Sequence, residues 1–194
     1  MGAKVITTKW VDTNKGTDSE PNYRSRLVGR ELNLSDRPDL FAATPPLESL
    51  KYIVSKCASS QRRAKPHRIL SIDVSRAYFY AKSIRPVFIQ IPAEDRQPGD
   101  EDMVGKLNLS LYGTRDAAQN WAVEYTRTLT EAGFEAGKAS PCNFRHKVRD
   151  LTLTVHGDDF TVTGPMEDLL WLLDVSRAST TSRQASLATR ENSV

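Results

Sequence analysis

Apolar and polar residues alternate most clearly between residues 151 and 164, where Leu, Val and Phe take turns with threonine on both sides of a short polar break. This period of two predicts a pair of half-buried strands joined as a β-hairpin. Its bend is expected at residues 156–159, because Gly157 can adopt a turn conformation that other residues resist. The hairpin would therefore present Asp158 and Asp159 side by side at its tip.

Adjacent carboxylates repel each other, and a bound divalent cation relieves that repulsion. The same residues are common in solvated turns, so the hairpin alone leaves a metal site and an ordinary turn both open. A strand expected over residues 69–74 adds Asp73 near the end of an apolar run, where an unpaired charge is costly. One carboxylate at a strand end and two at a hairpin tip form the arrangement that two-metal phosphoryl-transfer enzymes use.

Helical spacing of apolar residues predicts three helices. The first is expected to begin at Thr44, because threonine can cap a helix and Pro45 suits the first turn. The second spans residues 115–132 and ends at Gly133, and the third begins at Met166. The apolar stripe of the first helix consists of Leu47, Leu50, Ile53, Val54 and Cys57.

The N-terminal stretch has the pattern of another hairpin, with arms at residues 5–12 and 24–32. Arg24, Arg26 and Arg30 lie at even spacing, so they share one face of a strand. A row of guanidinium groups can clamp phosphate oxygens, and it can also be a solvated strand face. The pattern leaves both interpretations open.

The composition allows a globular domain, with 39% hydrophobic residues in a chain of 194 residues. A formal charge of +3 is compatible with nucleic-acid binding without demanding it. Two cysteines make no disulfide framework, and there is neither a signal-peptide core nor an apolar run of about 20 residues that could cross a membrane. We therefore expect a reduced intracellular protein. From Ser176 onward apolar residues become scarce, so residues 176–194 are predicted to be disordered.

Six segments stand in an order and spacing that resemble the reverse transcriptase of copia-type LTR retrotransposons, over residues 9–164. Each segment is weak evidence alone, and the ordered set is specific. The segments are YRSRLV at 23–28, SIDVSRAYF at 71–79, VFIQIP at 87–92, KLNLSLYG at 106–113, GF at 133–134 with SPC at 140–142, and VHGDDF at 155–160. The family counterparts are YKARLV, LDVKTAF, VYMxQP, KLxKSLYGL, GF with DPC, and YVDD.

The resemblance implies an α+β fold made of the fingers and palm of a right-hand polymerase, with an antiparallel palm sheet and flanking helices. The matching segments stop before a thumb, so a thumb is not expected in this stretch. The implied domain covers residues 1–175 and is followed by the tail at 176–194. Within it, the fingers would take about 5–66 and 82–118, and the palm about 67–81 and 119–164.

The resemblance also implies an RNA-directed DNA polymerase that adds nucleotides to a primer 3′-hydroxyl with two Mg²⁺ or Mn²⁺ ions. By position in the motifs, Asp73 and Asp158 would bridge the metals, Asp159 would support one of them, and the Val74 carbonyl could add a ligand. The partners implied are an RNA or DNA template with its primer, deoxynucleoside triphosphates and the rest of a Pol polyprotein. The expected location is a cytoplasmic particle or the nucleus, with no membrane association.

The nucleotide-binding residues implied by the resemblance come from three segments. Arg24 and Arg26 would contact the triphosphate, and the Tyr78 ring, beside Phe79, would lie under the sugar and exclude a 2′-hydroxyl. Asp116 begins a helix that faces the nucleotide in the family, where the usual residue is Gln. An Asp there would favour the helix dipole but oppose a triphosphate, so replacing it with Gln is expected to cost at most about 1 kcal/mol of stability.

Two departures from the family pattern bear on activity. His156 and Gly157 replace the Tyr and Val that precede the Asp pair, and Asp116 replaces Gln. The sequence therefore leaves three alternatives open: an active polymerase domain, a decayed remnant that only binds nucleic acid, or another metal-dependent phosphotransfer enzyme such as a nuclease.

Overall fold

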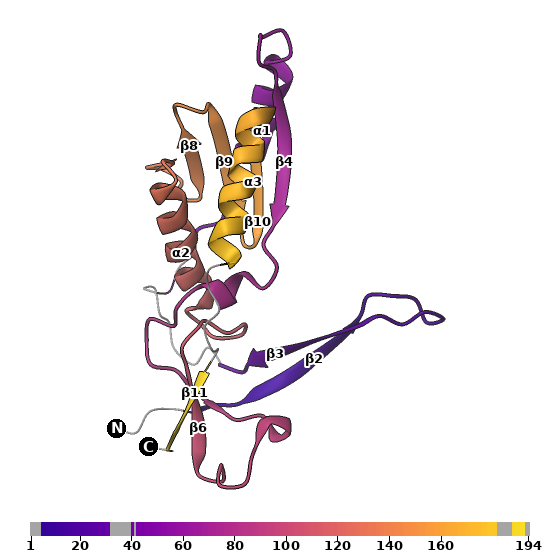
Figure 1. The fold of residues 1–194 in the computed structure, drawn as a ribbon, viewed down its shortest axis with the longest axis vertical. Helices are drawn as coiled ribbons and strands as arrows, with labels where there is room; N and C mark the ends of the chain where they lie inside the picture. Colours follow the sequence, from indigo (N-terminus) through magenta and orange to yellow (C-terminus); the bar gives the residue numbers. More distant parts are fainter. Residues whose placement is uncertain (1–4, 32–39, 41, 182–187, 193–194) are drawn as a thin grey trace.

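The computed structural model describes residues 5–31, 40, 42–181 and 188–192. Figure 1 shows an elongated molecule whose α-helices and larger sheet lie together in one half. The described residues form three α-helices, and the larger sheet has five strands. A four-stranded sheet and a two-stranded hairpin occupy the other half. The chain is therefore α+β, as the sequence predicts.

The five-stranded sheet is antiparallel throughout and has the strand order β4-β10-β9-β8-β7. Its outer strand β4 comes from earlier in the chain and pairs with β10, so the C-terminal hairpin is joined to a segment far away in sequence. The strands are β4 (His67–Asp73), β7 (Glu135–Ala136), β8 (Asn143–His146), β9 (Leu151–His156) and β10 (Asp159–Pro165).

The hairpin predicted at residues 151–164 is confirmed as β9 and β10, and its bend is tighter than expected. His156 pairs with Asp159, so only Gly157 and Asp158 form the turn. Gly157 has a φ of 65°, which favours glycine and is required at the first position of the two-residue hairpin turns. The apolar residues of both strands are buried, but the alternation holds only in part, because Thr154 and Thr163 are buried as well.

Helix α2 (Ala117–Glu131) follows the predicted spacing and covers the core of the five-stranded sheet. Trp121, Tyr125 and Leu129 are buried on its inner face. Tyr125 meets Phe144 and Phe160 edge to face, with ring centroids 6.0 Å and 5.8 Å apart. The helix ends at the predicted glycine: Gly133 has a φ of 93° and donates its N–H to Thr130, while Phe134 donates to Leu129.

Helix α1 (Leu47–Ser59) begins later than predicted. Thr44 is not its cap, because Pro46 occupies the N-cap position in an extended conformation, with a ψ of 153°. A proline also pushes the residue before it out of helical conformation, so Pro45 and Thr44 stay outside the helix. The expected apolar stripe is wrong as well: only Ile53 is buried, while Leu47, Leu50 and Val54 are exposed.

The four-stranded sheet has the order β1-β5-β6-β11 and its own small core, separate from that of the larger sheet. Its strands are β1 (Val5–Ile6), β5 (Phe88–Gln90), β6 (Met103–Leu107) and β11 (Ala188–Asn192). The core residues are Ile6, Val87, Ile89, Leu107 and Leu111.

The prediction that residues 176–194 are disordered is wrong for part of that range. Helix α3 (Met166–Thr181) runs beyond residue 175, and β11 pairs antiparallel with β6. Composition does not reveal this pairing, because the edge of β6 offers backbone donors and acceptors to any strand that reaches it. Residues 182–187 and 193–194 lie outside the described part of the chain.

The N-terminal hairpin consists of β2 (Thr8–Asn14) and β3 (Tyr23–Gly29), and it projects away from the rest of the molecule in Figure 1. The predicted first arm is divided, since residues 5–6 belong to β1 in the four-stranded sheet. Two short 3₁₀ helices, η1 (Ala77–Tyr80) and η2 (Ala93–Asp95), complete the described elements.

Candidate active site

The carboxylates predicted from the sequence meet where β4 ends beside the β9–β10 turn. Asp73 lies directly opposite Asp159 in the β4–β10 register. One step further, the Val74 N–H donates to the Asp158 carbonyl over 3.0 Å. Because hydrogen-bonded and non-hydrogen-bonded pairs alternate in antiparallel strands, Asp73 and Asp159 form the non-hydrogen-bonded pair, in which side chains approach more closely. The two strands thus bring together carboxylates 86 positions apart, from residues 73 and 159.

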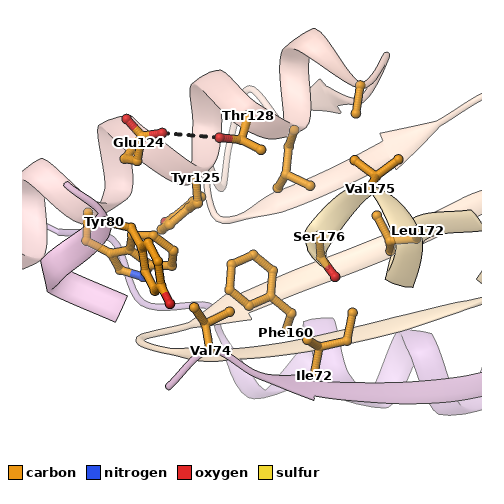
Figure 2. A pocket seen from close by; sticks show the side chains of 13 residues that line it. Ile72, Val74, Tyr80, Glu124, Tyr125, Thr128, Phe160, Leu172, Val175 and Ser176 are labelled. Carbon is orange, nitrogen blue, oxygen red and sulfur yellow. Dashed lines mark hydrogen bonds between the residues drawn. The ribbon is translucent and has the colours of Figure 1, made fainter. Parts of the chain in front are cut away.

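The neighbours of Asp73 point to the other side of the strand. Figure 2 shows Ile72 and Val74 beside Phe160 around an apolar cavity of about 80 Å³ under α2 and α3. Asp73 lies between two cavity-lining residues, so alternation directs its side chain away from the cavity, and the residue is exposed. The expectation that Asp73 carries a burial cost is therefore wrong. Asp158 and Asp159 are exposed too.

The turn that carries Asp158 is fixed by two hydrogen bonds to its backbone. The Trp121 indole N–H donates to the Gly157 carbonyl over 2.8 Å, in addition to the bond from Val74 to Asp158. Trp121 is buried on α2 and meets Phe160 edge to face. Its helical spacing predicts burial, but nothing in the sequence reveals that its N–H reaches this turn.

Tyr78 and Phe79 lie on η1, the next element after β4, and both contact Tyr112. The Tyr78 and Tyr112 rings are stacked with centroids 4.4 Å apart, and Phe79 meets Tyr112 edge to face at 5.7 Å. Burial, and then the negative charge of Asp158, raises the pKa of Tyr78 above its ordinary value. The aromatic cluster therefore lies within electrostatic reach of the turn carboxylate. Tyr112 belongs to a family motif, but sequence reasoning gives it no role.

Arg24 and Arg26 are exposed on β3, and their even spacing puts them on one face of the hairpin. Thr13 and Val11 are their register partners on β2. The pKa of Tyr112 is raised by burial and by Asp158, and this rise is opposed first by a hydrogen bond from the Tyr78 backbone and then by the positive charge of Arg26. Arg26 therefore approaches the same aromatic cluster from the hairpin side, and Arg24 lies two residues nearer the hairpin tip.

Asp116 occupies the N-cap position of α2 but makes no capping hydrogen bond, and only 4% of its surface is exposed. Its carboxylate accepts hydrogen bonds from Arg85 at 3.0 Å and from Asn120 at 3.1 Å. Arg85 also pairs with Glu31. Burial alone would lower the pKa of Arg85, but the hydrogen bonds to Asp116 and Glu31 outweigh it and raise that pKa. Asp116 thus lies in a buried ion network, which the sequence does not reveal.

The donor set suits Mg²⁺ or Mn²⁺, which prefer carboxylate oxygens. Asp73, Asp158 and Asp159 supply such oxygens from adjoining backbone positions. In the part of the chain that the structure describes, no three His, Cys, Asp or Glu side chains are gathered closely enough to hold a metal ion. The exposed carboxylates fit the metals by chemistry and backbone position, and their side chains would have to converge for binding.

Comparison with known proteins adds independent information. The family model described as reverse transcriptase (RNA-dependent DNA polymerase) matches residues 1–178. The Retrovirus-related Pol polyprotein from transposon TNT 1-94 of Nicotiana tabacum is 23% identical over 177 residues, which cover 87% of this chain and 13% of that protein. The Pol polyproteins from transposons RE1 and RE2 of Arabidopsis thaliana are each 24% identical, covering 86% and 82% of this chain.

The chain spans only 11–13% of the length of these curated relatives. No solved structure matches the chain significantly. Among the described residues, no helix is long and apolar enough to cross a membrane. Since the family model covers most of the chain, this protein belongs to the reverse transcriptase (RNA-dependent DNA polymerase) family.

Proposed function

We propose that this chain is a reverse transcriptase domain of a copia-type retrotransposon, which transfers deoxynucleotides to a primer 3′-hydroxyl opposite an RNA or DNA template. The observation that supports this most directly is the alignment of Asp73 with Asp159 beside the fixed turn of Asp158. Together with the family assignment, it favours nucleotidyl transfer over an ordinary solvated turn. In this proposal the five-stranded sheet with its helices is the palm, and the β2–β3 hairpin with the four-stranded sheet belongs to the fingers.

Asp73 and Asp158 would hold Mg²⁺ or Mn²⁺ between them, Asp159 would support one ion, and the Val74 carbonyl could contribute a further oxygen. When bound, two such ions supply Lewis-acid stabilisation to the attacking and leaving oxygens of the transfer. The chain's own contribution is to fix these ligands. Trp121 and the Val74 N–H hold the turn carbonyls, so the backbone of Asp158 keeps one position relative to β4.

The nucleotide would bind between the β2–β3 hairpin and the carboxylates. Arg24 and Arg26 would neutralise triphosphate oxygens, because guanidinium groups bind phosphate with paired hydrogen bonds. Tyr78, with Phe79 beside it, would form the surface under the sugar and reject a 2′-hydroxyl. Asp116 would act indirectly: Arg85 already neutralises its carboxylate, so its charge opposes a triphosphate less than the sequence suggests.

The proposed partners are the template with its primer, deoxynucleoside triphosphates and the other parts of a Pol polyprotein. The last of these follows from the relatives, whose printed names are Pol polyproteins and whose length greatly exceeds that of this chain.

Incorporation of labelled dTTP on an oligo(dT)-primed poly(rA) template, with Mg²⁺ or Mn²⁺, tests the proposal. We expect Asp158→Asn to lower incorporation by roughly 100-fold or more, the usual scale when an electrostatic stabiliser of the transition state is lost. Glu131→Gln is the matched control, because this carboxylate is 61% exposed at the far end of α2 and pairs only with Arg127 in the contacts the structure gives it. It should leave incorporation unchanged.

Two results would contradict the proposal. Metal-dependent cleavage of the same primer–template without incorporation would show a nuclease. Binding of the primer–template without metal, and no incorporation with either ion, would show a remnant that only binds nucleic acid.

A further inference from the structure

Tyr112 lies where the three parts of the proposed site meet. Its ring stacks on Tyr78 with centroids 4.4 Å apart and planes 30° from parallel, and Phe79 meets its edge. Burial and the negative charge of Asp158, in the carboxylate turn, raise the pKa of its hydroxyl, and the positive charge of Arg26, on the hairpin, acts to lower that pKa. Tyr112 itself is half-buried. It therefore contacts the aromatic cluster directly and faces both charged parts.

The backbone of Tyr112 is fixed at the base of the β2–β3 hairpin. The Tyr112 carbonyl accepts a hydrogen bond from the Gly29 N–H over 2.7 Å, at the base of the β2–β3 hairpin. The next residue, Gly113, has a φ of 83°, and any Cβ there would lie 2.1 Å from the Gly29 carbonyl oxygen. Residues 112–113 and the hairpin base thus form one close backbone contact, which fixes the position from which the Tyr112 ring projects.

Tyr78 is the residue on which the Tyr112 ring stacks. It lies in the four-residue helix η1, entered through Arg76 in the left-handed region with a φ of 58°. Its half-buried side chain packs against the core of the five-stranded sheet, and Tyr112 stacks on its ring. A stacked aromatic pair shifts a conformational equilibrium by roughly 2- to 12-fold. This is enough to determine which orientation of the Tyr78 ring is the more populated.

We propose that Tyr112 is a positioning residue for sugar selection, whose ring holds Tyr78 in the orientation that excludes a 2′-hydroxyl. This inference rests on the proposed polymerase function. It assigns to Tyr112 an effect on the choice between deoxyribose and ribose, rather than on the chemical step. The stacked ring faces require an aromatic side chain at residue 112, and the Tyr112 hydroxyl adds a hydrogen bond with the Tyr78 backbone.

The test compares kcat/KM for dGTP and GTP on an oligo(dG)-primed poly(rC) template, in the wild type, Tyr112→Phe and Tyr112→Leu. Tyr112→Phe keeps the stacked ring and loses only the hydrogen bond of the hydroxyl with the Tyr78 backbone, so it should change the ratio less than Tyr112→Leu does. Tyr112→Leu removes the stacked ring and should lower the preference for dGTP by roughly 2- to 12-fold, mainly through better use of GTP. Leu111→Ala is the matched control, because this neighbour is fully buried in the small core of the four-stranded sheet and disturbs the same segment without touching the stack.

An unchanged ratio in Tyr112→Leu would overturn the inference, as would an equal fall in the ratio for Leu111→Ala, which would indicate general loosening. A wild type that incorporates no nucleotide would instead contradict the proposed function. In that case the preference is read from equilibrium binding of dGTP and GTP with Mg²⁺ by isothermal titration calorimetry. The same change in the binding ratio is then expected for Tyr112→Leu, and its absence overturns the inference.

Discussion

Asp116 behaves as a buried partner and not as a surface charge at a helix end. A helix-end carboxylate exposed to water contributes about 0.3–1 kcal/mol through the dipole, which is the basis of the expectation from sequence. The structure instead surrounds it with donors from Arg85 and Asn120, and Arg85 is shared with Glu31. The contribution of Asp116 to the free energy of unfolding is therefore that of hydrogen bonds to a buried charge.

We predict that Asp116→Asn lowers the free energy of unfolding by about 2 kcal/mol, the scale for a buried hydrogen bond to a charged group. Arg85 would keep Glu31 but lose the partner on its other side. Urea denaturation at pH 7 measures the change. Glu131→Gln on the same helix is the control, because its pair with Arg127 is exposed and should matter by less than about 0.5 kcal/mol. Equal effects of the two substitutions would mean that the Asp116 network does not stabilise the fold.

At the scale of elements, the β2–β3 hairpin is attached to the rest of the molecule through its base. Gly29 donates to Tyr112, and Glu31 donates its N–H to the Gly113 carbonyl over 3.3 Å. The Glu31 carboxylate accepts the Arg115 N–H over 2.8 Å. The base of the arginine-bearing strand β3 is therefore held by a turn that is distant in sequence, since residues 31 and 115 are 84 positions apart.

Gly113→Ala should disturb this attachment. An alanine there destabilises the fold by about 1–2 kcal/mol because of the left-handed backbone, and its Cβ also displaces the Gly29 carbonyl. Gly99 provides a matched control: its φ is 97°, but a Cβ there would meet nothing within 4 Å. Thermal and urea unfolding should therefore show a larger loss for Gly113→Ala than for Gly99→Ala. Equal losses of stability in the two variants would show that the hairpin base accommodates the added Cβ at residue 113 without further destabilisation.

Helix α1 is tied to the five-stranded sheet by a polar contact as well as by Ile53. The Asp150 carboxylate accepts hydrogen bonds from Lys56 on α1 at 2.8 Å and pairs with His67 on β4 at 3.1 Å. Burial alone would raise the pKa of Asp150, but Lys56 and then His67 outweigh it and hold that pKa below its ordinary value. The ionised carboxylate is therefore favoured in the folded state.

This sign sets a pH dependence. Because the folded-state pKa of Asp150 is lowered, its contribution to stability is fully present above the unfolded value of about 3.9 and is lost as the pH falls through the folded-state value. Asp150→Asn should cost about 1 kcal/mol at pH 7, a modest figure because the carboxylate is 36% exposed. Asparagine also tolerates the φ of 49° at this position.

Urea denaturation of the wild type and Asp150→Asn between pH 7 and pH 3 measures this effect, and the difference between them should shrink below about pH 4. Glu135→Gln, which removes an exposed pair with Lys147, should show a smaller difference at pH 7. A constant difference over the whole range would mean that the charge of Asp150 is not what stabilises this contact.

For the whole molecule, the proposed site lies where two separately packed halves meet. One core fills the space between the five-stranded sheet, α2 and α3, and the other lies in the four-stranded sheet. The carboxylates belong to the first half and the arginines to the β2–β3 hairpin, and the Tyr78–Tyr112 stack joins them.

The sequence by itself determined the features that depend on local pattern. A period of two marks β9 and β10, helical spacing and Gly133 mark α2 and its end, and the apolar run that leads to Asp73 marks β4. The order of the family motifs indicated the reverse transcriptase family, and the match of the family model to residues 1–178 confirms that family. Side-chain periodicity and backbone preference are properties of short segments, so they can be deduced without knowing the fold.

Only the tertiary structure decided the contacts between distant segments. It placed Asp73 opposite Asp159, brought the Trp121 N–H to the carboxylate turn and buried Asp116 beside Arg85. It also paired β11 with β6, where composition predicted disorder. Each of these contacts depends on which surfaces pack together in the folded chain. Burial, charge pairing and strand partners are determined by that packing and not by the neighbouring residues in the sequence.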